Sequence, residues 1–130
     1  MRRHFPLLEA DERTLNARGY EWESVSEGDT RWVLIHGYPV PAGLGHREVD
    51  LAVQVPKLYP SQELDMAWFF PALARGDGRD INATSPQAFD GRQFQRWSRH
   101  REKSEPWRVG VDDLRSHLVY VDLWLEREVA

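Results

Sequence analysis

The sequence predicts an α+β fold in which two helices flank an antiparallel sheet. Valine or leucine occupies every odd position of residues 49–55, which is the pattern of a strand with one face on a core. From Val111 to Leu125, apolar residues recur at alternating steps of three and four, which indicates a closing helix with one buried stripe. Pro6 and Gly19 bracket residues 7–18, which are expected to form a short amphipathic first helix.

Four strands are predicted between these helices. They are expected at residues 20–25, 31–36, 49–55 and 64–70. The first two alternate around turn-forming residues 27–30, which is typical of a hairpin. Consecutive strands joined by short links make an antiparallel meander, and a closing helix over residues 112–127 completes the layout.

Two loops interrupt this pattern. Residues 38–45 contain two prolines, which lack backbone donors, so we expect a loop there. Residues 74–91 are rich in turn formers and poor in apolar anchors, so we expect a second, longer loop. A loop of that length in a compact domain is usually functional or mobile.

The composition is that of an ordinary globular protein. The chain has 130 residues, 41% hydrophobic and 29% charged, which fits one domain over residues 1–130 and disfavours disorder. Its net charge of -4 argues against nonspecific nucleic-acid binding by the whole surface. No apolar run is long enough to span a bilayer and no signal peptide is recognised, so a cytoplasmic protein without membrane contact is expected.

The absence of cysteine restricts the chemistry. Disulfides, thiolate metal sites and a thiol nucleophile are excluded for this sequence. The five histidines are scattered without metal-ligand spacing, so no metal site is expected. No cofactor is expected either.

The block of residues 93–100 concentrates the polar chemistry. Ser98 and His100 would point to the same side of an extended segment, which makes a hydroxyl–imidazole contact feasible. The basic stretch of residues 92–103 has a plain interpretation as a solvated face. A second interpretation is nucleic-acid binding with Trp97 stacking on a base, which the acidic net charge disfavours.

Several segments recur in an order that is typical of a known family. They are Tyr38-Pro39-Val40-Pro41-Ala42-Gly43, Val55-Pro56-Lys57-Leu58-Tyr59-Pro60 with Leu64-Asp65-Met66, Phe89-Asp90-Gly91-Arg92, Arg96-Trp97-Ser98-Arg99-His100 and the segment from Trp107 to Leu114. With these segments, most of the chain resembles the ubiquitin-conjugating (E2, UBC) fold, and in particular the prokaryotic E2 family E. The last segment is similar to the Trp-Ser-Pro segment that follows the active site of E2 enzymes. The resemblance implies a UBC-like fold with a long loop of the active-site type, in which Pro56, Tyr59, Pro60 and Trp107 are a structural motif.

The resemblance also implies a function. E2 enzymes carry a ubiquitin-like protein on a cysteine as a thioester, but this chain has no cysteine and lacks the family's His-Pro-Asn motif. Asn82 is the nearest asparagine, in the same general region of the chain, and is grouped with Arg96 and Arg99 as a candidate for binding the oxyanion or the partner. The resemblance places Ser98 where the thiol is expected, so Ser98 can carry the partner as an oxyester with His100 as its base. Arg96 and Arg99 can hold the acyl oxyanion or the partner's acidic surface.

Three alternatives remain open at this level. The protein can be a catalytically inactive E2 variant that binds an E1-like adenylating enzyme, or a ubiquitin-like or multi-ubiquitin protein. A natural cysteine can have been replaced in this sequence. Finally, a serine beside a tryptophan usually just bonds the backbone, and Asp65 more simply caps or salt-bridges a turn than acts in catalysis.

Overall fold

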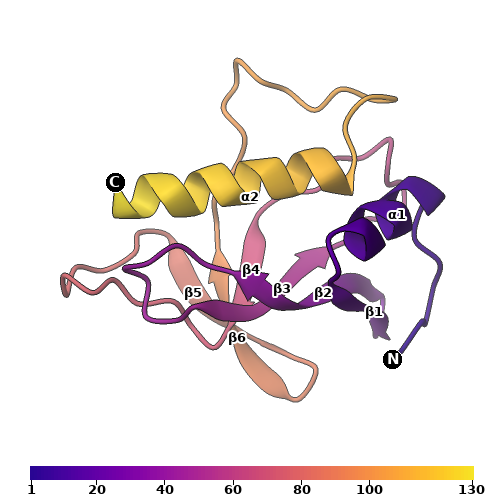
Figure 1. Ribbon diagram of the computed structural model, residues 1–130. Coiled ribbons are helices and arrows are strands. Elements are labelled where there is room, and N and C mark those ends of the chain that lie inside the picture. The colour runs from indigo at the N-terminus through magenta and orange to yellow at the C-terminus, as the bar shows by residue number, and fades with distance from the viewer.

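Six strands form one antiparallel sheet in the computed structural model, which describes all 130 residues. In chain order the elements are α1 (Glu9–Ala17), β1 (Glu21–Glu27), β2 (Thr30–Pro39), β3 (Glu48–Gln54), β4 (Ala67–Phe70), β5 (Thr84–Phe89), β6 (Arg92–Trp97) and α2 (Leu114–Val129). The strand order is β1-β2-β3-β4-β6-β5. Figure 1 shows α2 running across one face of the sheet, with α1 beside the end of the sheet that carries β1. The predicted α+β layout is therefore confirmed.

The sheet is larger than the predicted four-stranded meander. The first four strands do follow one another, but a hairpin of β5 and β6 extends the sheet beyond β4. A loop was predicted over residues 74–91, and this prediction is wrong where Thr84–Phe89 form β5. Pro86 argued against a strand, yet β5 lies at the edge of the sheet, where a missing backbone donor costs no ladder hydrogen bond.

Two strand limits also differ from the prediction. β2 continues through Tyr38 and Pro39, where a loop was expected, because a register shift after Ile35 lets the strand resume its pairing with β3. The fourth strand begins at Ala67 and not at residue 64, because Met66 has a φ of 61° and cannot continue a strand.

Both helices lie where they were predicted, with shifted ends. α1 begins only at Glu9, because Leu8 is extended and serves as its N-cap. α2 begins at Leu114, and the Asp113 side chain accepts a hydrogen bond from the backbone of Ser116 as its N-cap. Val111 is 60% exposed and lies outside the helix, so its place in the predicted stripe is wrong, whereas the other four stripe residues are buried.

The sheet buries apolar side chains on both faces. The main core lies between the sheet and the two helices and includes Leu15, Ile35, Phe69 and Leu118. A second, aromatic cluster covers the opposite face, where the Phe89 ring stacks on Trp32 with centroids 4.2 Å apart. The tip of the β5–β6 hairpin reaches across this face, since Asp90 N donates a hydrogen bond to Glu27 of β1. No helix is both long and apolar enough to cross a membrane.

Candidate functional site

Ser98 lies at the end of β6, where the chain leaves the sheet. Its backbone N–H donates to the Ala83 carbonyl at 2.9 Å, which extends the pairing of β6 with β5 by one residue. The next residue turns the chain, because Arg99 N donates to the Trp97 carbonyl at 2.8 Å. The Ser98 side chain is half-buried and its hydroxyl forms no hydrogen bond within the chain. A hydroxyl without a hydrogen bond therefore lies at the C-terminal end of β6.

His100 pairs with an acid from a distant part of the sequence. Its Nδ1 atom lies 2.8 Å from Asp65 Oδ2 and 2.9 Å from Oδ1, whereas no hydrogen bond joins it to Ser98. The pair is partly solvated, since the His100 and Asp65 side chains are 58% and 32% exposed. The Asp65 carboxylate contacts Nδ1, and the other ring nitrogen, Nε2, forms no hydrogen bond within the chain. This is the arrangement in which an acid orients a histidine base.

Buried His117 on α2 fixes the turn that carries Asp65. Its Nε2 atom lies 2.9 Å from the Met66 carbonyl. Burial lowers the pKa of His117 to about 4, so the ring is neutral and Nε2–H donates to that carbonyl. Asp65 also accepts from the Met66 backbone at 3.0 Å, which caps the same turn as expected from the sequence. The geometry of Asp65 thus depends on the start of α2.

The other predicted site residues surround this segment without joining the His100–Asp65 pair. Neither Arg96 nor Arg99 pairs with a carboxylate: Arg96 Nη2 lies 3.7 Å from Met66 Sδ, and the Arg99 guanidinium lies 5.5 Å from the Trp97 ring centroid. Asn82 is exposed and precedes Ala83, so the Ser98–Ala83 hydrogen bond brings its backbone close to Ser98. Trp97 is 3% exposed and cannot stack on a base, so the stacking contact that was considered for nucleic-acid binding is wrong.

The residues of the Pro-x-x-Tyr-Pro turn contact the tryptophan expected behind them. Trp107 Nε1 donates to the Pro60 carbonyl at 3.0 Å, and its ring centroid lies 6.3 Å from that of Tyr59. Within the turn, Tyr59 N donates to the Pro56 carbonyl at 3.0 Å. The loop between β6 and α2 is thus anchored to the loop between β3 and β4, and Ser98 lies on the first part of that anchored loop.

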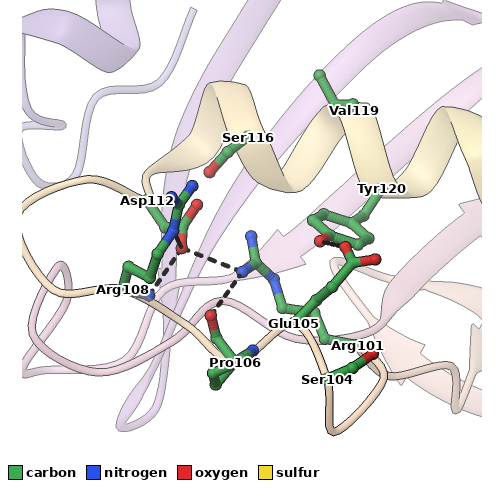
Figure 2. Close-up of a pocket in the computed structure, with 9 residues that line it drawn as sticks. All are labelled: Arg101, Ser104, Glu105, Pro106, Arg108, Asp112, Ser116, Val119 and Tyr120. Atoms are coloured by element: carbon green, nitrogen blue, oxygen red, sulfur yellow. Dashed lines mark hydrogen bonds and ion pairs between the residues drawn. The ribbon is translucent and has the colours of Figure 1, made fainter.

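A cleft of about 400 Å³ opens between this loop and the first turns of α2 (Figure 2). Asp112 lies in its wall and is almost fully buried. Burial alone would raise the pKa of Asp112, but hydrogen bonds from the Arg101 guanidinium and the Arg108 backbone lower it to about 2. Neither in this cleft nor in the rest of the chain is a group of three or more histidine and carboxylate side chains placed to hold a metal ion.

Sequence reasoning did not identify the residues that contact the predicted site residues. Asp65 is 35 residues from His100 and Asp112 is 11 residues from Arg101, and neither spacing belongs to a recognisable motif. From the sequence His117 was only one of five scattered histidines, whereas in the structure it is buried with Nε2 on the Met66 carbonyl. These contacts join the loop between β3 and β4, the loop between β6 and α2, and the first turn of α2, which are separate in the sequence.

The model of one protein family, described as Prokaryotic E2 family E, matches residues 7–128. The match spans both helices, the sheet and the loop with Ser98 and His100. No curated protein and no solved structure matches the chain.

Proposed function

Because this chain belongs to prokaryotic E2 family E, we propose that it carries a ubiquitin-like protein as an oxyester on Ser98. Membership in an E2 family implies two partners, an E1-like adenylating enzyme that supplies the acyl group and a ubiquitin-like or multi-ubiquitin protein that is carried. The pathway is a bacterial protein-conjugation pathway.

The pairing of His100 with Asp65 is the observation that supports a serine nucleophile. A serine hydroxyl is un-ionised near neutral pH and needs a base. His100 lies two residues from Ser98, and its Nδ1 atom is held by Asp65 at 2.8 Å, so Nε2 is the nitrogen that can take a proton. The Ser98 hydroxyl has no competing hydrogen bond and is free to turn toward it.

The reaction proceeds by acyl transfer in two steps. In the first, the Ser98 oxygen attacks the acyl carbon held by the E1-like enzyme, the bond to that enzyme breaks, and the hydroxyl proton passes to His100 Nε2. In the second, an acceptor amine attacks the ester carbon, an amide forms, and the Ser98 oxygen regains a proton. Arg96 and Arg99 have no carboxylate partners, so their charge is available for the oxyanion or the carried protein.

A catalytically inactive scaffold is the second candidate. The specific observation that favours it is the absence of a hydrogen bond between Ser98 and His100, in a chain without cysteine. Hydrogen bonds of a catalytic site are often long in a free enzyme and tighten in the complex, so this absence does not exclude the carrier. The scaffold binds the same two partners and forms no covalent adduct.

Formation of a covalent adduct separates the two candidates. The protein is incubated with its E1-like enzyme, ATP and the ubiquitin-like protein, and products are resolved by denaturing electrophoresis with and without hydroxide. The carrier gives a hydroxide-labile adduct that is lost in Ser98→Ala and retained in Ser104→Ala, an exposed serine of the same loop. Ser98→Cys converts the adduct into a thioester that thiols cleave.

Each other outcome has a defined meaning. An adduct that persists in Ser98→Ala contradicts the serine assignment. Absence of an adduct together with stable binding to either partner supports the scaffold. Absence of both adduct and binding contradicts both candidates.

A further inference from the structure

Arg101 is the most deeply buried guanidinium at the cleft, and two of its nitrogens have no partner. Its side chain is 7% exposed. Nη1 donates to Asp112 Oδ2 at 3.1 Å and lies 3.4 Å from the Pro106 carbonyl, but the buried Nε and Nη2 atoms form no hydrogen bond. Leaving buried donors unpaired is costly, so an unfilled partner position is indicated.

The two unpaired nitrogens belong to the same edge of the guanidinium. Nε and Nη2 form the side-on edge, whose two parallel N–H bonds match the spacing of the oxygens of one carboxylate. The Asp112 carboxylate uses the opposite end, through Nη1, and leaves this edge empty. The guanidinium is held in place by two rings, with Tyr120 and Trp107 centroids at 4.3 and 5.1 Å. A preorganised edge of this kind selects a planar oxyanion.

The surroundings favour an anion from a partner. Figure 2 shows the Arg101 guanidinium in the middle of the cleft, between Arg108 and Tyr120. The Arg108 side chain is 68% exposed, so its guanidinium can reach a ligand at the mouth. Two carboxylates also line the cleft, but both already have partners: Asp112 pairs with Arg101 and Arg108, and Glu105 accepts from Tyr120. The unpaired edge of Arg101 is therefore the group of the lining that is left for an anionic ligand.

We propose that this cleft binds a carboxylate of an acidic peptide segment on a partner protein. Arg101 holds the carboxylate through its side-on edge, and Arg108 adds a second charge from the rim. In the free protein Tyr120 donates a hydrogen bond to Glu105, an exposed residue of the loop. Because Tyr120 also packs against the Arg101 guanidinium, with its ring centroid 4.3 Å away, entry of a ligand beside that guanidinium is expected to disturb the Tyr120–Glu105 pair. The proposal is independent of acyl transfer by Ser98.

An NMR titration of the whole chain tests the assignment. The probe is the dipeptide Glu-Glu, acetylated and amidated so that only side-chain carboxylates remain, and the neutral control is Gln-Gln blocked in the same way. The expected result is a saturable shift of the Arg108, Ser116 and Tyr120 signals with Glu-Glu alone. No saturable shift, or equal shifts with both peptides, overturns the proposal.

Three variants locate the site. Arg108→Gln is expected to weaken binding about tenfold, as removal of one charged contact does. Arg101→Lys keeps the charge beside Asp112 but removes the side-on edge, and a loss of about tenfold or more is expected. Arg115→Gln is the matched control, because Arg115 is an exposed arginine on the first turn of α2 outside the cleft.

The same titration separates carboxylate from phosphate. Inorganic phosphate is added in a parallel arm, and weaker binding than Glu-Glu is expected. Tighter binding of phosphate would overturn the peptide assignment. Equal loss of binding in Arg108→Gln and Arg115→Gln would show that only general charge attraction is at work, and would overturn it as well.

Discussion

Tyr59 donates a hydrogen bond of 2.6 Å to Asp11, which joins the Pro-x-x-Tyr-Pro turn to α1. The same hydroxyl accepts from Leu114 N at 2.9 Å, so it also reaches the first residue of α2. Asp11 is 1% exposed. Burial and the hydrogen bond to Asp11 both raise the pKa of the Tyr59 phenol, which keeps its proton for this contact. One hydroxyl therefore links three segments of the chain.

Replacing Tyr59 by phenylalanine is expected to lower the free energy of unfolding by about 1–3 kcal/mol, because Asp11 and the Leu114 N–H lose a buried partner. The ring remains, so packing against Trp107 is unchanged. Urea denaturation measures the difference. Tyr20→Phe is the matched control, since the Tyr20 hydroxyl forms no hydrogen bond, and an equal loss in both variants would contradict the assigned role.

A closed ring of ionisable side chains holds the N-terminal segment and the β5–β6 turn against the sheet. In order around the ring, the members are Arg2, Glu23, His36, Asp50, Arg92 and Asp90. Both nitrogens of His36 face carboxylates, Glu23 at 2.8 Å and Asp50 at 3.0 Å, so both must donate. Burial alone would lower the pKa of His36, but these hydrogen bonds outweigh it and raise the pKa above its usual value.

Stability is therefore expected to fall as the pH rises past neutrality. Because the folded pKa of His36 lies above the unfolded value of about 6.5, its contribution is complete below about pH 6.5 and is lost as the pH rises through the folded pKa. His36→Gln should flatten this alkaline decrease in urea unfolding experiments. His46→Gln, which changes an exposed histidine, should keep it. An unchanged decrease in His36→Gln would refute the assignment.

The carboxylates of the same ring have the opposite effect on the pH dependence of stability. Hydrogen bonds from Arg2 lower the pKa of Glu23 from 4.5 to about 2. Its contribution is present above the unfolded pKa and is lost as the pH falls toward 2. The His36→Gln variant should therefore retain a decrease in stability toward acid pH.

Periodicity predicted the fold wherever one face of an element is buried. The alternation in β3 and the stripe of α2 each reflect a single apolar face on the main core, and both elements were located correctly. β5 was missed because it has no continuous apolar face that could give a periodic pattern. Only Phe89 is buried among its six residues, and its pairing with β6 depends on contacts made beyond the strand itself, such as Phe89 against Trp32.

The position of the candidate site followed from a family resemblance, whereas its contacts did not follow from the sequence. Ser98 and His100 are close in the chain, but the observed partner of His100 is Asp65, which a β-strand and a hairpin separate from it. Likewise, the unpaired edge of Arg101 depends on where Tyr120 and Trp107 hold the guanidinium. Such relationships depend on tertiary packing and leave no periodic signal.

Asp112 should contribute measurably to stability through its charge. Its side chain is 2% exposed, and its pKa is lowered from 3.8 to about 2 although burial alone would raise it. A shift of that size corresponds to about 2 kcal/mol. Asp112→Asn is expected to lose this amount at neutral pH, with the difference from the native protein shrinking as the pH falls through 4 toward 2. Asp29→Asn, which changes a residue of an exposed turn, should leave the free energy of unfolding unchanged in the same urea experiment.

Asp65 is expected to act on the reaction and not on partner binding. Asp65→Asn keeps an oxygen that can accept from Met66 N, so the turn should persist, but it removes the carboxylate that orients His100. If His100 is the base for Ser98, the rate of adduct formation should fall by about 10- to 100-fold while affinity for the E1-like enzyme stays the same. Glu63→Gln, an exposed acid two residues earlier, is the control. An unchanged rate in Asp65→Asn would mean that Ser98 reacts without an oriented base. A rate and an affinity that fall together would instead place Asp65 in the partner interface, because only an effect confined to the rate separates a positioned base from a binding contact.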